Sequence, residues 1–183
     1  MKKSLLLLTA LISLFYYSKN AQAAFLLEPF AGMNFNSTAE VSGTDEDVTG
    51  TSVGARIGFQ NMGLMLGLDA RRNSWNFETD TTDSDYTFSQ LGFFVGYDFP
   101  MMLRIWGNYV FSYEGTNDDD SDIKLKEGSG MVFGIGYKVV PFVSLNFEIS
   151  NLETKKLDNG TSESNYDADY STYLLSVSFP LSL

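Results

Sequence analysis

The chain has 183 residues, a net charge of −11 and neither cysteine nor histidine. Its length suggests one domain, and the missing cysteines exclude a disulfide framework. A chain this acidic will not bind nucleic acid through its bulk charge.

The first 23 residues have the three parts of a secretory signal peptide. Lys2 and Lys3 form a basic start, Ser4 to Tyr17 form an apolar core, and Ala21-Gln22-Ala23 is a small-x-small cleavage site. The alternative is a membrane anchor, but the apolar run is too short for one. We therefore expect residues 1–23 to be cleaved. Residues 24–183 then form the mature domain, with a net charge of −14 because three lysines leave with the signal.

After residue 24 the hydrophobic pattern has a period of two, which is typical of β-strands. In chain order the predicted strands are 26–36, 51–60, 63–74, 87–99, 102–113, 129–139, 142–152 and 171–182. Each is about ten residues long, the length that a tilted strand needs to cross a bilayer.

The connections between these strands alternate between short and long. Tight connections fall at 60–62, 100–101 and 140–141, and long polar ones at 37–50, 75–86, 114–128 and 153–170. This alternation predicts an all-β fold: an eight-stranded antiparallel up-and-down transmembrane β-barrel, with turns at one end and loops at the other.

Each predicted strand has an apolar face and a face of small or polar residues. In a soluble barrel of the lipocalin kind the apolar face would point inward. Here the polar face is rich in Gly, Ser and Asn, which suits the crowded inside of an eight-stranded barrel. Aromatic residues near the strand ends resemble the girdles of membrane barrels: Phe35, Phe59, Phe99, Tyr113, Tyr137, Tyr173 and Phe179. We therefore expect the apolar face to contact lipid.

Eight charged residues share the inward parity, four acidic and four basic. They are Glu28, Arg56, Asp69, Arg71, Asp98, Arg104, Lys138 and Glu148. Buried charges are costly unless they are paired, so we expect a neutral interior network that plugs the barrel; a gate or proton path is the alternative. Asp98 and Arg104 flank a tight turn and can face each other, and Asp69 and Arg71 lie two apart on one strand face.

The other nineteen of the 23 acidic residues lie in the four long connections. The run NDDDSD, 117–122, suggests a weak calcium site at Asp118, Asp119, Asp120 and Asp122, because carboxylates are ligands for hard cations. The run lacks the EF-hand pattern, so a solvated acidic loop is favoured over a metal site. No cofactor is predicted.

Four stretches resemble the small eight-stranded outer-membrane barrels of the OmpA transmembrane domain and OmpX type: LEPFAGMNF, FSQLGFFVGYDFP, GSGMVFGIGYKVVP and YLLSVSFPLSL. The resemblance implies the outer membrane of a Gram-negative bacterium, with lipid and lipopolysaccharide around the barrel. It also implies that the barrel-insertion machinery binds the C-terminal strand, 171–183. Leu183 departs from the aromatic residue that usually ends this family.

The sequence leaves three functions open. The favoured one is a structural or surface-interaction role, in which four long acidic loops contact an extracellular or host surface. The others are a narrow ion-conducting pore and a soluble periplasmic ligand carrier. Barrel enzymes of this size rely on histidine, and without histidine or cysteine their mechanisms are excluded, so we predict no enzyme.

Overall fold

The computed structural model describes residues 23–41, 44–78, 83–118 and 122–183. The predicted signal peptide falls almost entirely outside this range and stays a prediction. In the part of the chain that is described, no helix is long and apolar enough to cross a membrane.

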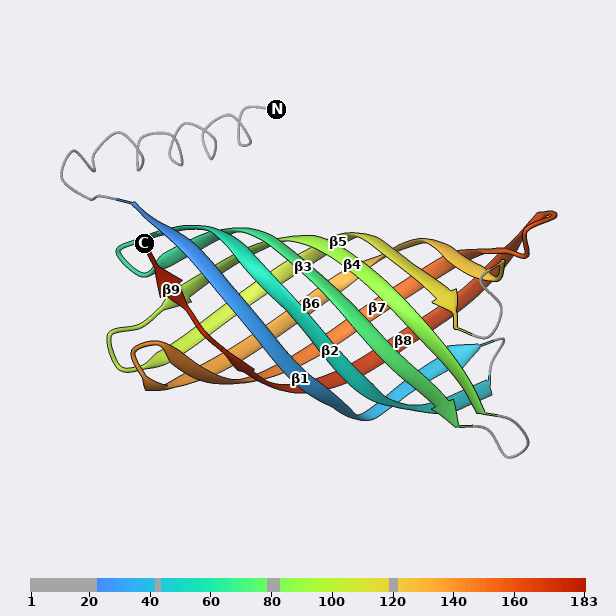
Figure 1. The fold of residues 1–183 in the computed structure, drawn as a ribbon, viewed down its shortest axis with the longest axis horizontal. Helices are drawn as coiled ribbons and strands as arrows, with labels where there is room; N and C mark the ends of the chain where they lie inside the picture. The colour runs from blue at the N-terminus through green and yellow to red at the C-terminus, as the bar shows by residue number, and fades with distance from the viewer. Residues whose placement is uncertain (1–22, 42–43, 79–82, 119–121) are drawn as a thin grey trace, which may run out of the picture.

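The described residues form a closed antiparallel barrel (Figure 1). Its strands are β1 (Ala24–Val41), β2 (Thr44–Asn61), β3 (Leu64–Glu78), β4 (Asp83–Asp98), β5 (Leu103–Asn117), β6 (Lys124–Val140), β7 (Val143–Asp158), β8 (Glu163–Ser178) and β9 (Leu181–Ser182). From β1 to β8 each strand pairs with the next, and β1 closes the barrel by pairing with both β2 and β8. The predicted eight-stranded up-and-down barrel is therefore confirmed.

The predicted last strand, 171–182, is divided into β8 and β9 at Phe179 and Pro180. Proline has no N–H to donate to the sheet, so regular pairing stops there. The Phe179 N–H still donates to the Pro29 carbonyl at 2.9 Å. Because β9 then pairs with β1, the two pieces act as one barrel strand.

The prediction of four long loops is wrong. Most of 37–50, 75–86, 114–128 and 153–170 belongs to strands that continue the barrel well beyond the predicted boundaries. We call the described part of these four segments, together with the adjoining strand residues 87–88 and 110–113, the outer extension. In Figure 1 it forms the end of the barrel opposite the chain termini. The polar composition of these segments suggested loops, but every second side chain points into the barrel, as in a strand.

The other end of the barrel has the predicted tight connections. Met62 and Gly63 join β2 to β3 and both have positive φ, 48° and 87°. Two positive φ values are typical of the two-residue turn that matches the twist of a β-hairpin. By the usual orientation of such barrels, this end faces the periplasm and the outer extension faces outward.

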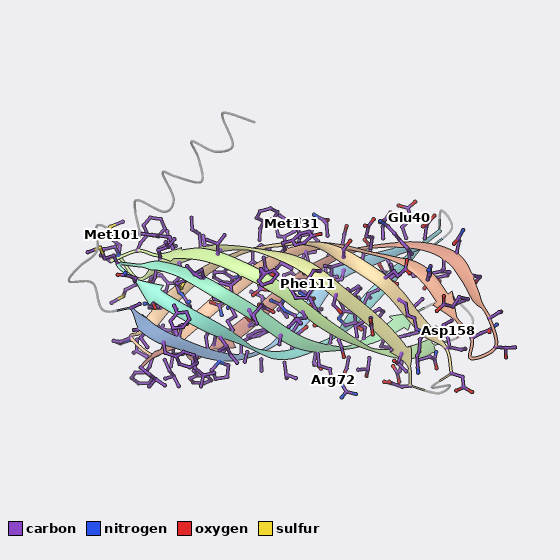
Figure 2. The ribbon with its side chains drawn as sticks, turned by 90° about the horizontal axis from the view of Figure 1, so that it is seen from above. Glu40, Arg72, Met101, Phe111, Met131 and Asp158 are labelled. Carbon is purple, nitrogen blue, oxygen red and sulfur yellow. The ribbon has the colours of Figure 1, made fainter. Side chains whose placement is uncertain are left out.

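The predicted faces of the strands are also observed. Large apolar side chains such as Val53, Phe93 and Leu175 are exposed on the outside, while Glu28, Arg56 and Glu148 are fully buried inside. Figure 2 shows the apolar side chains around the barrel from Met101 to the level of Met131, and charged ones such as Glu40 and Asp158 beyond. This apolar exterior is the surface that lipid requires.

Tyr113 is an exception to the predicted faces. We expected it in the lipid-facing girdle, but it is fully buried in the lumen. The pairing of β5 with β6 shifts between Val110 and Tyr113, so a bulge adds one residue to β5. One extra residue reverses the side-chain parity beyond it.

Candidate functional site

Six of the eight predicted charges meet in the lumen. Glu28, Arg56, Asp69, Arg71, Arg104 and Glu148 form what we call the ion cluster, with three positive and three negative groups. They come from β1, β2, β3, β5 and β7, so the cluster bridges the barrel from side to side. Its formal charge is zero.

Arg56 is the centre of this cluster. It donates to Glu28 at 3.0 Å, to Asp69 at 3.1 Å and to Glu148. Glu28 and Asp69 are its register partners on the two neighbouring strands, whereas Glu148 reaches it across the lumen. One guanidinium therefore contacts three carboxylates, and such charge-assisted hydrogen bonds are the strong ones.

Arg71 and Arg104 complete the charge balance. Arg71 donates to Asp69 at 2.6 and 2.8 Å and to Glu148 at 2.7 Å. Arg104 makes a bidentate pair with Glu28, with both distances 2.7 Å. Asp69 and Arg71 lie together on one strand face, as predicted. Arg104, which we expected to face Asp98, bonds to Glu28 instead.

Asp98 and Arg104 are register partners across the turn, as expected, but they form no ion pair. Asp98 pairs with Lys138 instead, and the Gln60 side chain donates to it at 3.2 Å. This second pair lies by a pocket of about 370 Å³ that opens among the tight turns. Buried Leu26, Met65 and Phe94 form an apolar cluster inside the same barrel. The eight predicted charges therefore divide into six and two.

Aromatic rings pack on the ion cluster. The Arg56 guanidinium lies 4.4 Å from the Trp106 ring centroid and 4.9 Å from that of Phe30. Trp106 in turn fills the space over Gly134, where any Cβ would overlap its indole. These contacts exclude water from the cluster and strengthen its electrostatic interactions.

Above the ion cluster a polar layer crosses the lumen. The Asn34 amide donates to Ser52 at 3.1 Å, and the Ser52 hydroxyl donates to Asn73 at 2.6 Å. A cavity of about 10 Å³ lies here, between Arg71 below and Trp75 above. That volume suits about one water molecule, so this cavity is not a channel.

The sequence reasoning missed a second closure, in the outer extension. We call it the aromatic plug, and its members are Trp75, Phe88, Tyr113 and Tyr170. Phe88 stacks on Tyr113 with ring centroids 4.9 Å apart and lies 4.8 Å from the Trp75 ring. Tyr170 closes the group at 5.5 to 5.8 Å from the other three. Aliphatic residues of the same core surround it: Ala39, Val48, Val110, Leu125, Val132, Leu152 and Ala168.

A sequence signal for this plug existed. Val48 and Trp75 continue the inward parity of their strands into segments that we assigned to loops. Their apolar residues are separated by Thr, Asp and Glu, which lowered the average hydrophobicity. The period of two, not the average, was the reliable signal.

Beyond the plug the outer extension carries ion pairs on its surface. The Lys126 ammonium lies 2.6 Å from Asp158. Its hydrogen bond, with help from the Gly160 backbone N–H, holds the pKa of Asp158 below the ordinary value of 3.8, and Asp158 raises the pKa of Lys126. Asp158 and Lys126 are therefore both charged at neutral pH.

The weak metal prediction receives no support from geometry. Asp119 and Asp120 lie outside the described residues, while Asp118 and Asp122 are exposed. Among the described side chains no group of three or more acidic residues is placed to hold a metal ion.

Comparison with known proteins supports the assignment of the fold. No protein-family model matches the chain. Outer membrane porin G of Escherichia coli (strain K12) is 33% identical over 57 residues, 31% of this chain and 19% of that protein. The chain thus spans about a fifth of the length of that curated relative.

Two solved structures match nearly the whole barrel. Neisserial surface protein A has a TM-score of 0.57 and 16% identity, covering 86% of this chain and 98% of that one. Ail, the attachment invasion locus protein of Yersinia pestis, has a TM-score of 0.52 and 11% identity, covering 87% and 98%.

The fold and the apolar exterior define the class: the chain is a small β-barrel protein of the Gram-negative outer membrane. Within that class it has the eight-stranded architecture of the OmpA transmembrane domain and OmpX type.

Proposed function

We propose that the protein is a closed, non-enzymatic membrane anchor that presents the acidic outer end of its sheet to a partner at the cell surface. The observation that carries the proposal is the double closure of the lumen, by the ion cluster and by the aromatic plug. A barrel filled at two levels leaves little room for transport or for a substrate. Its outer end, with exposed Glu40, Glu114, Asp167 and Asp169, is then the surface available for function.

The charge of this end suggests the chemistry of the partner. Carboxylates outnumber lysines there, so a basic surface would be attracted and an anionic one repelled. Ail was crystallised in complex with the heparin analogue sucrose octasulfate. A polyanion of that kind is the opposite of what the outer end of this chain would attract.

The anchor proposal can be tested by replacing the four exposed carboxylates together: Glu40→Gln, Glu114→Gln, Asp167→Asn and Asp169→Asn. These substitutions remove four negative charges and leave Leu152 and Tyr170, which belong to the buried core, in place. Cells displaying this variant should adhere less to a surface coated with a basic polypeptide, and the difference should shrink at high salt. Folding of the variant is checked by its mobility in SDS electrophoresis, which changes on boiling when the barrel is folded. If the folded variant adheres as well as the wild type, the proposal is rejected.

A narrow pore is the second candidate, favoured by the 57-residue match to Outer membrane porin G. It requires the ion cluster to open. A steady conductance in planar bilayers that changes with Arg104→Ala would support it, whereas a silent bilayer for both proteins would count against it.

We also propose that residues 171–183 are recognised by the barrel-insertion machinery. In support, Leu175, Phe179, Leu181 and Leu183 are all exposed on the outer face at the end of the chain. Removing 181–183 should slow assembly into the outer membrane, measured by the rate at which the heat-modifiable form appears; an unchanged rate would argue against this role.

A further inference from the structure

Arg72 occupies an unusual place on the outside of the barrel. Its side chain points away from β3 and is exposed, as Figure 2 shows. Below it on the same face, Leu64, Leu66, Leu68 and Ala70 are all apolar and exposed; above it is Ser74. Arg72 is eight residues from Leu64, a rise of about 20 Å for a tilted strand, against an apolar band about 25 Å tall. It therefore lies at the outer edge of the band that contacts lipid.

The neighbouring strands change character at the same level. The register partners of Arg72 are Val53 on β2 and Ser89 on β4. The next outward residue above Val53 is Thr51, and the next one below Ser89 is Leu91. Arg72 is thus flanked by apolar side chains on the membrane side and by hydroxyls on the outer side, a composition typical of a headgroup contact.

No carboxylate of the described chain neutralises Arg72, because none forms an ion pair with it. The nearest outward carboxylate by register is Glu114, opposite Ser89 and two strands away, at about 10 Å between backbones. Three exterior lysines differ: Lys126, Lys155 and Lys156 lie farther out and contact carboxylates. Arg72 therefore offers its five N–H donors to something outside the chain.

The position determines what that ligand can be. An arginine at the outer edge of the lipid belt extends its head toward the headgroups while its stem stays in apolar surroundings. A guanidinium binds phosphate by two parallel hydrogen bonds, and nearby hydroxyls can add further donors. In the outer leaflet of a Gram-negative outer membrane the phosphates at this depth belong to lipid A.

We propose that Arg72, with Thr51, Ser74 and Ser89 around it, is a binding site for a phosphate of lipid A. The site would attach one glycolipid to the outside of β2, β3 and β4. It depends only on the position of the chain in the membrane and not on the proposed surface role, so either can fail without the other.

The test compares two probes on the purified barrel in detergent: lipid A, and the same lipid after enzymatic removal of its phosphates. Native mass spectrometry measures the bound fraction of each. The wild type should prefer lipid A by about fivefold, the ratio that corresponds to about 1 kcal/mol for one basic residue at an anionic membrane surface. Arg72→Ala should abolish the preference, while Arg72→Lys should retain part of it.

The matched control is Lys155→Ala, which removes the same charge from an exposed site farther out on β7. It should leave the preference unchanged. Equal preference for lipid A in Arg72→Ala and the wild type would overturn the proposal, and so would an equal loss in both variants, which would show a response to net charge alone. Because Arg72 is exposed, each variant should fold, and heat-modifiable mobility in SDS checks that it does.

Discussion

The two closures of the lumen are built from different chemistry. The ion cluster lies in the part of the barrel that is surrounded by lipid and joins five strands through six charges. The aromatic plug lies in the outer extension and joins its strands through stacked rings and aliphatic side chains. The first depends on a complete, neutral set of partners, whereas the second depends on filling volume.

The two closures should therefore respond differently to mutation. Removing one member of a buried charged group leaves the other members unpaired, which costs more than the pair contributed. Removing a ring from an apolar core leaves a cavity, and its cost depends on how far the neighbours can relax. A single substitution should therefore lower the free energy of unfolding more in the ion cluster than in the aromatic plug.

The largest effect is expected for Arg56→Ala, which removes the centre of the ion cluster. Three carboxylates lose a partner, and Glu148 and Glu28 are fully buried. The free energy of unfolding should fall by about 3–5 kcal/mol, measured by urea titration in a fixed lipid or detergent.

The control for that variant is Arg104→Ala, whose guanidinium pairs with Glu28 alone. Its cost should be smaller than that of Arg56→Ala. Adding Glu148→Gln to Arg56→Ala should recover part of the loss, because one unpaired charge is removed. Equal costs for the two arginines would contradict the central role given to Arg56.

The next effect is expected for Phe88→Ala in the aromatic plug. Phe88 is fully buried and touches Trp75, Tyr113 and Tyr170. The loss should be about 3 kcal/mol, seen as a lower urea midpoint. Phe111→Ala, which truncates an exposed ring on β5, should cost clearly less. If both substitutions cost the same, the outer extension does not contain a packed core.

A smaller effect is expected for Gly134→Val. Its side chain would overlap the Trp106 indole, which packs on Arg56. Overpacking of this kind costs about 1–3 kcal/mol. The control is Gly107→Ala on β5, where a new Cβ would meet only Phe133 carbons at 3.7 Å; that change should be close to neutral. A neutral Gly134→Val would mean that Trp106 can leave the ion cluster freely.

The smallest effect concerns the ion pairs on the surface of the outer extension. Since the pKa of Asp158 is lowered in the folded chain, its pairing stabilises the β6–β7 edge at pH values above 3.8. That stabilisation is lost as the pH falls through the lowered pKa. Carbon-detected NMR of the Asp158 carboxyl should show titration below 3.8, and Lys126→Ala should move the midpoint upward. The Gly160 backbone N–H and Lys124 set the shift that remains. An unmoved midpoint would contradict the pairing.

The sequence predicted the barrel because strand parity depends on side chains that lipid or close packing selects. Val53, Ile57 and Phe59 alternate with Gly54, Arg56 and Gly58, and that alternation admits one arrangement of inside and outside. The inward position of all eight charges followed from the same parity. Parity did not predict which charges pair with each other. Glu148 contacts Arg56 across the lumen, and parity gives no information on distances across a barrel.

Two local features were missed at the sequence level, each for a physical reason. The bulge before Tyr113 adds one residue to β5, and bulges have no strong residue preference that would reveal them. The outer extension was assigned to loops because its outward positions carry Asp, Glu and Thr, as water-exposed strands do. Only its inward residues, such as Val48 and Trp75, distinguish it from a loop.

The most direct test of this account is hydrogen exchange of backbone amides in the outer extension, measured by NMR on the barrel in detergent micelles. Amides at Val48, Phe88, Leu125 and Tyr170 lie in paired strands around the plug. They should exchange many times more slowly than those at Gly160 and Thr161 in the β7–β8 turn. Exchange at those four positions as fast as in the turn would mean that the barrel ends at the lipid boundary and that mobile acidic loops, not a second closure, lie beyond it.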